Sequence, residues 1–169
     1  TVIAPDYAGF SYNQAPGYFN AEDEAHAILD ATRAAAKILP NPPAKVAFVG
    51  HSQGGHAVVA AQSYAEAYGM TGQLVGVATV APFWVSMTLF AAATTAAAGP
   101  LSTAKAEDIS AILYAMAYAY SATELREGAG TGTDVFQTAK RTAAKDALLG
   151  GACYDQAKLM ALGTNPSEW

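Results

Sequence analysis

The segment VAFVGHSQGGHAV, residues 46–58, constrains the fold more than any other part of the chain. A valine-rich apolar run typical of a buried strand ends at Gly50, and a helix-forming pattern begins directly after Ser52. The pattern therefore predicts a sharp strand-to-helix turn with Ser52 at its tip. Gly50 and Gly54 are the expected small neighbours, because larger side chains would collide where the chain reverses.

Such a turn gives a serine a chemical role. A serine hydroxyl attacks a carbonyl at neutral pH only with a base nearby and with donors that hold the developing oxyanion. The Gln53 backbone N–H, at the start of the helix, is placed to be one of those donors. A glycine-serine-glycine pattern alone is weak, but the strand before it and the helix after it predict that Ser52 is a nucleophile.

Residues 1–82 have the alternating pattern of an α/β sheet. Residues 1–5, 45–50 and 74–81 are apolar runs typical of buried strands. Helices are predicted between them: one is capped by Asn20, has an acidic first turn and is ended by prolines, and the other spans residues 53–68. Strand-helix alternation predicts parallel pairing, and hence part of a doubly wound sheet.

Residues 83–169 lack this alternation and are predicted to form a mostly helical cap, inserted after the third strand. Helices are expected at residues 107–126 and 134–149, joined by a glycine-rich connection. Apolar side chains just after Pro82 are expected to cover the serine: Phe83, Trp84, Met87 and Phe90. These side chains form either an acyl-chain wall or mobile lid, or ordinary packing of the cap on the core, and both alternatives stay open.

Composition narrows the classes of partner. The net charge is −5 and the nine Lys and Arg are scattered, which gives no basic surface for nucleic acid. Residues 70–104 carry no charge, but glycines and prolines interrupt the run, so we expect a buried strand and an apolar helix instead of a transmembrane span. Cys153 is the single cysteine, which leaves no disulfide within these residues and no zinc site built from thiolates.

The chain resembles the secretory lipase family, which is lipase A-like and has the α/β-hydrolase fold. The resemblance rests on PDYAGF, ILDATRAAAKI, GHSQGGHAV and LVGVATVAP in this order, and it extends over residues 1 to about 85 and is thin through the cap. It implies a secreted ester hydrolase that acts on ester or lipid substrates without a metal or organic cofactor, with Ser52 as nucleophile and the cap as lid. Contact with a lipid interface is left open.

The base and acid of such an enzyme are not evident in these residues. We expect His51 to pack beside the sheet, His56 to be a packing histidine, His26 to lie at the surface and Asp6 to shape a loop. The resemblance implies that the triad Asp and His follow the cap. The chain begins within a predicted strand, so we expect these partners in missing segments of a longer polypeptide or in a second chain.

Other functions remain open on the same fold. The chain could be a catalytically incomplete or structural hydrolase-like fragment, or part of a peptidase or acyltransferase, because a fold does not determine its chemistry. The preferred substrate chain length and the oligomeric state are not determined by the sequence.

Overall fold

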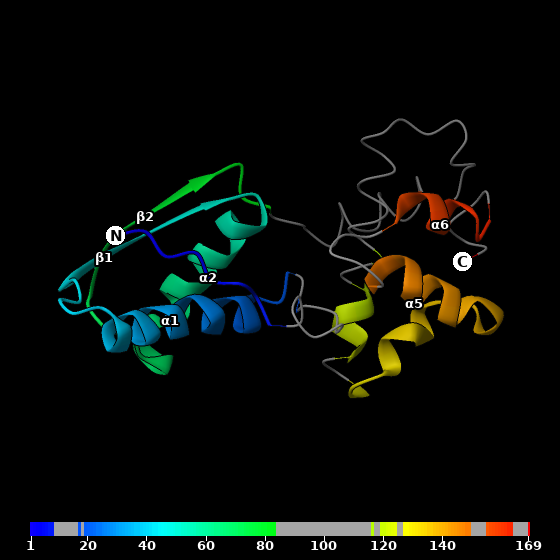
Figure 1. Cartoon of the computed structure of the whole chain (residues 1–169), viewed down its shortest axis with the longest axis horizontal. Helices are drawn as coiled ribbons and strands as arrows, with labels where there is room; N and C mark the ends of the chain where they lie inside the picture. Colours follow the sequence, from blue (N-terminus) through cyan, green and yellow to red (C-terminus); the bar gives the residue numbers. More distant parts are fainter. Residues whose placement is uncertain are drawn as a thin grey trace. The chain divides into compact units, whose positions relative to one another are not determined.

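The chain divides into two compact units in the computed structural model. The first comprises Thr1–Ala8 and Phe19–Trp84, and the second Gly9–Tyr18 and Val85–Trp169 (Figure 1). The structure describes residues 1–8, 17, 19–83, 116, 119–124, 127–149, 155–163 and 169. Each unit has its own hydrophobic core.

The first unit is a two-stranded parallel sheet with two helices. Its elements follow one another as α1 (Ala21–Ile38), β1 (Lys45–His51), α2 (Gln53–Tyr68) and β2 (Gln73–Val80). β1 and β2 pair in parallel from Lys45↔Gln73 to His51↔Val80, with one irregularity early in the ladder. This arrangement confirms the predicted strand-helix-strand pattern as a partial α/β fold.

The ends of α1 and α2 lie where capping residues place them. The Asn20 side chain accepts a hydrogen bond of 2.8 Å from Asp23 N, as expected for an N-cap. α1 ends at Ile38 because Leu39 has an extended backbone, the conformation that the following Pro40 requires. α2 ends at Gly69, whose φ of 87° is accessible without strain only to glycine.

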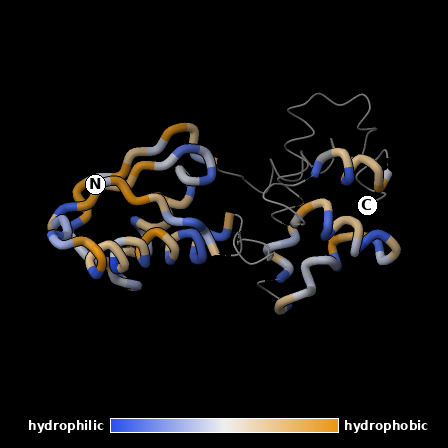
Figure 2. Tube along the Cα trace, in the orientation of Figure 1, coloured by the Kyte–Doolittle hydropathy of each residue, from blue (hydrophilic) through white to orange (hydrophobic). Residues whose placement is uncertain are grey.

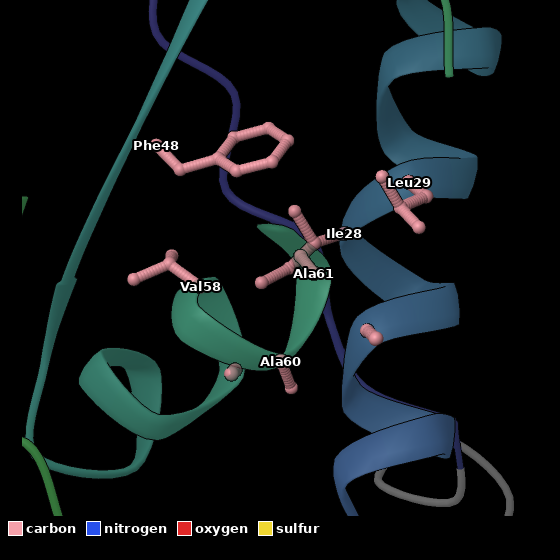
Figure 3. Close-up of a cluster of buried hydrophobic side chains, with 8 residues drawn as sticks. Ile28, Leu29, Phe48, Val58, Ala60 and Ala61 are labelled. Carbon is pink, nitrogen blue, oxygen red and sulfur yellow. The ribbon is translucent and has the colours of Figure 1, made fainter. Parts of the chain in front are cut away.

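The core of this unit lies between the two helices and β1 (Figure 3). Phe48 of β1 packs against side chains of both helices: Ala25, Ile28, Leu29, Ala57, Val58, Ala60 and Ala61. The small residues of α2 allow the helix to approach α1 and β1 closely. Figure 2 shows hydrophobic residues prevailing along the strands and alternating with hydrophilic ones along α1.

Two expectations for the strands were wrong. Residues 1–7 form no strand, and Val2 and Ile3 are 95% and 47% exposed. A strand needs a neighbour that supplies hydrogen bonds. This segment instead lines an open cavity of about 460 Å³ together with residues of α1 and β1. β1 is not buried on both faces either, because successive side chains alternate and Val49, next to the buried Phe48, is 74% exposed.

The described part of the second unit is helical. It contains the 3-10 helices η2 (Thr131–Val135) and η3 (Thr138–Lys140), then α5 (Arg141–Leu149) and α6 (Gln156–Met160). Its core is formed by Tyr120, Phe136, Ala144, Ala147, Leu159 and Trp169. Residues 119–124 are helical, and the rest of the helix expected at 107–126 lies mostly outside the described residues.

The helix predicted from residue 134 begins later, at Arg141. Phe136 is buried with an extended backbone, and Gln137 N donates to the Trp169 carbonyl at 2.6 Å. An extended residue interrupts the helical hydrogen-bond ladder, so this tertiary contact divides the segment into short turns. Within the described ranges, no helix is both long and apolar enough to cross a membrane.

The core of the first unit gives a direct test of this fold. Leu29 is fully buried, whereas Ile38 on the same helix is 77% exposed. We expect Leu29→Ala to lower the free energy of unfolding by about 2–5 kcal/mol, because it removes buried contacts and leaves a cavity. Ile38→Ala is the matched control and should change it by less than about 0.5 kcal/mol. Urea denaturation followed by circular dichroism measures both; equal losses would contradict the described core.

Candidate active site

Ser52 occupies the tip of the turn between β1 and α2 in a strained conformation. Its φ of 53° and ψ of −116° lie in a region that side-chain-bearing residues rarely adopt. Backbone hydrogen bonds tie the turn to the end of β2 and the segment after it: Ser52 N donates to the Val80 carbonyl at 3.0 Å, and Phe83 N donates to the Ser52 carbonyl at 2.9 Å. The end of β2 and the segment after it therefore fix the position of Ser52.

Glycines make this turn sterically feasible, though not both of the expected ones. A Cβ on Gly50 would lie 2.0 Å from the Gly54 carbonyl oxygen, so Gly50 is required as predicted. The expectation for Gly54 was wrong within the described part of the chain, where a Cβ at this position would meet nothing within 4 Å. Gly55 is the second constrained position, since its Cβ would lie 2.8 Å from the Pro82 Cα. The strand-to-helix turn thus depends on Gly50 and Gly55.

The Ser52 side chain is not used to cap the helix. Ser52 is the N-cap residue of α2 but makes no side-chain capping hydrogen bond. The first N–H groups of a helix lack partners within the helix and carry partial positive charge, which favours a negative oxygen at this end. Gln53 is the first residue of α2, so its N–H belongs to this set. The turn thus brings together a serine hydroxyl and donors suited to an oxyanion.

Backbone strain gathers around this turn. Within the described residues, Phe19, Ser52 and Ala81 are the non-glycine residues with positive φ, at 56°, 53° and 44°. The Phe19 ring stacks on the Phe83 ring with centroids 4.0 Å apart and planes 17° apart. Ala81 lies in the chain between Val80 and Phe83, whose backbones hydrogen bond to the Ser52 N–H and carbonyl. Strained residues that cluster in this way are typical of functional sites.

Of the apolar residues expected to cover Ser52, the structure describes one. Phe83 lies beside the turn through its backbone bond to Ser52 and its stack on Phe19. Trp84, Met87 and Phe90 lie outside the described residues. Phe19 was not predicted, and its position just before a helix cap offered no signal for an aromatic wall.

No histidine of the chain is hydrogen bonded to the Ser52 hydroxyl among the described residues, which include all three. His56 Nδ1 lies 2.7 Å from Glu24 Oε2, which agrees with the packing role expected for it. His26, expected at the surface, is half-buried and stacks on the partly exposed Tyr68 with ring centroids 3.6 Å apart. His51 is exposed, and the expectation that it packs beside the sheet was wrong.

Glu24 is the buried charged group of this site, and its role was missed from the sequence. Only 1% of the residue is exposed, and its carboxylate contacts Phe19, Gln53 and His56. The sequence placed Glu24 among acidic residues that favour a helix N-terminus. Its spacing of four from the buried Ile28 was the available signal, because it puts Glu24 on the core-facing side of α1.

The charge of Glu24 also acts on a neighbour. Burial, and secondarily the Glu24 charge, raise the pKa of Tyr7 to about 12. Within the described ranges, no group of three or more His, Cys, Asp and Glu side chains is arranged to hold a metal ion.

The glycine geometry predicts a contrast between two substitutions. Gly50→Ala should lower the free energy of unfolding by about 3 kcal/mol or more, because the new methyl group would overlap the Gly54 carbonyl. Gly54→Ala is the control and should stay within about 1 kcal/mol, since its Cβ would meet no described residue within 4 Å and alanine favours a helix. Denaturant unfolding measures both, and equal tolerance at the two positions would contradict the geometry.

Comparison with known families identifies the chain at the level of a broad family. The family model described as "Alpha/beta hydrolase family" matches residues 1–167. The chain therefore belongs to the alpha/beta hydrolase family. Comparisons with curated proteins and with solved structures give no match.

Proposed function

We propose that this alpha/beta hydrolase is a carboxylic ester hydrolase of the lipase or esterase type, with Ser52 as its nucleophile. The observation that carries the proposal is the strained Ser52 at the N-terminus of α2, whose hydroxyl makes no capping bond. Hydrolytic activity in general is expected from the family. The choice of esters rests on the resemblance to secretory lipases and on the apolar surroundings of Phe19 and Phe83.

The proposed reaction has two halves, acylation of Ser52 and hydrolysis of the acyl group. The Ser52 oxygen attacks the ester carbonyl carbon, and the carbonyl oxygen becomes negative and accepts a hydrogen bond from Gln53 N–H. The serine proton passes to a histidine and then to the departing alcohol, which leaves an acyl group on Ser52. Water, deprotonated by the same histidine, attacks the acyl group, and the acid is released as Ser52 regains its proton.

The histidine and the aspartate that orients it are proposed to lie outside these 169 residues. The chain has three histidines. His26 stacks on Tyr68, His56 contacts the Glu24 carboxylate, and His51 is exposed. We propose that other segments of the same polypeptide, or a second chain, bring the pair to Ser52. Secretion of the protein is likewise proposed from the resemblance alone.

The acyl side of the substrate is proposed to lie against the aromatic stack. Phe83 and Phe19 pack ring on ring, and Phe83 is bonded through its backbone to Ser52. An apolar surface beside the nucleophile favours acyl chains over small polar groups. The role of Trp84, Met87 and Phe90 as an acyl-chain wall or lid, and contact with a lipid interface, stay predictions from the sequence, because these residues lie outside the described ones.

Labelling with a fluorophosphonate tests the nucleophile. The expected result is one phosphonyl group on Ser52, located by mass spectrometry of peptides, in the complete protein that carries this chain. Ser52→Ala should abolish the label. Ser63→Ala, on the same helix, should retain it, because the Ser63 hydroxyl donates to the Val59 carbonyl of its own helix at 3.2 Å. A folded protein without label on Ser52 would refute the proposal and favour a structural hydrolase-like fragment.

Chain-length preference tests the acyl site. Phe83→Ala should lower kcat/KM for 4-nitrophenyl octanoate about tenfold more than for the acetate, because a long chain loses apolar contact with the ring. The exposed Ile38→Ala is the control and should leave the ratio unchanged. A wild-type protein that turns over acetate best, or an unchanged ratio in Phe83→Ala, would contradict an acyl site at Phe83.

A further inference from the structure

We infer that Glu24 is a positioning residue for the oxyanion donor of Ser52. This inference rests on the proposed function and concerns a residue of α1, distant in sequence from the turn. The carboxylate joins α1 to the first turn of α2 through charge-assisted hydrogen bonds. Its task is to hold Gln53, whose backbone N–H faces the developing negative oxygen.

Three groups converge on the carboxylate. Gln53 Nε2 donates to Glu24 Oε1 at 2.7 Å, and Phe19 N donates to the same oxygen at 2.9 Å. His56 Nδ1 lies 2.7 Å from the other oxygen, Oε2. Gln53 and His56 are the first and fourth residues of α2, so they occupy one turn of the helix beside Ser52. Both carboxylate oxygens are thus directed at the start of the helix.

Burial makes these bonds strong and hard to exchange. Glu24 is 1% exposed, and a buried carboxylate without hydrogen-bond donors would cost several kcal/mol. Water cannot replace the donors without opening the site, so the carboxylate keeps Gln53 and His56 in fixed positions. Bonds to a charged group are also shorter and stronger than neutral ones.

The position of Gln53 matters because an oxyanion donor acts over a short range. A donor must lie about 2.7–3.1 Å from the oxygen that becomes negative, and loss of one donor lowers kcat by about 10²–10³. Glu24 holds the side chain of the residue that supplies this N–H. It also holds Phe19 N, and through it the ring that stacks on Phe83. One carboxylate therefore places both the donor and the aromatic wall.

A second role for the same pair is not supported by its geometry. A histidine bonded through Nδ1 to a carboxylate has the arrangement of a base in a serine hydrolase. His56, however, makes no hydrogen bond to the Ser52 hydroxyl within the described part of the chain; what links them is the backbone bond from His56 N to the Ser52 carbonyl at 3.2 Å. The structure assigns positioning, not proton transfer, to Glu24 and His56.

Two substitutions at Glu24 separate positioning from general stability. Glu24→Ala removes every contact and should slow phosphonylation of Ser52 by about 10–100-fold, with kcat for 4-nitrophenyl butyrate falling alike and KM changing little. Glu24→Gln retains an oxygen for Phe19 N and Gln53 Nε2 and an amide that can donate to His56 Nδ1, so it should stay within about threefold of wild type. The comparison uses the complete protein at a temperature where every variant is folded.

Matched controls accompany these variants. Glu22→Gln removes a charge from the same helical turn, but Glu22 is exposed, so the rate should not change. Leu29→Ala destabilises the same core and should retain the rate of wild type, which separates stability from positioning. Gln53→Met keeps the backbone N–H but removes the bond to Glu24, and it should slow labelling by at least about threefold even if Glu24→Ala fails to fold.

The outcomes are distinct from those for the nucleophile itself. Absence of label on Ser52 in wild type would overturn the proposed function together with this inference. If wild type is labelled and Glu24→Ala is labelled at the same rate, the inference alone is overturned. Where Glu24→Ala does not fold, labelling of Gln53→Met at the wild-type rate has the same consequence. If Leu29→Ala, compared at equal stability, loses as much of the phosphonylation rate as Glu24→Ala, the role of Glu24 is merely structural. That result would also overturn the inference. Loss in Glu24→Ala with rescue by Glu24→Gln supports the inference.

Discussion

The close approach of Gly50 to the Gly54 carbonyl is the constraint on which the rest of the first unit depends. With a Cβ at position 50 only 2.0 Å from that oxygen, β1 could not turn into α2 at this angle. The turn directs α2 back along the strand, where Val58 and Ala61 meet Phe48 in the core. The same turn leaves Ser52 at its tip with a positive φ. The packing of α2 in the core and the position of Ser52 thus both require a residue without a Cβ at position 50.

The strain at this turn is offset by bonds from three other segments. A residue in a sparsely populated backbone region costs about 1–3 kcal/mol, a large share of a net stability of about 5–15 kcal/mol. Val80 and Phe83 fix Ser52 through its own N–H and carbonyl, and Glu24 fixes the first turn of α2. Strain held in this way keeps the hydroxyl in one position, which is what a nucleophile requires.

Local patterns in the sequence were enough to predict much of this unit. The glycine-serine turn, the Asn20 cap and the parallel pairing of β1 with β2 follow from steric rules and short-range periodicity. Such rules did not predict Gly55, whose constraint comes from Pro82, far along the chain. They also missed the three contacts of Glu24, because a helix N-terminus explains an acidic residue without any tertiary partner.

The failures share a physical cause. Residues 1–5 are rich in β-forming residues, yet a strand exists only where a neighbour supplies hydrogen bonds, and periodicity does not identify that neighbour. Residues 134–140 favour a helix locally, but the bond from Gln137 N to the Trp169 carbonyl holds an extended backbone there. In both segments, contacts between distant residues outweigh local preference.

The crystal structure of the phosphonylated protein is the most direct test of Ser52 as nucleophile and of Gln53 N–H as oxyanion donor. We expect a covalent bond from Ser52 Oγ to phosphorus, with one phosphonyl oxygen about 2.7–3.1 Å from Gln53 N, the distance expected of an oxyanion donor. An adduct on another residue, or a phosphonyl group on Ser52 whose oxygens receive no hydrogen bond from Gln53 N, would contradict this expectation.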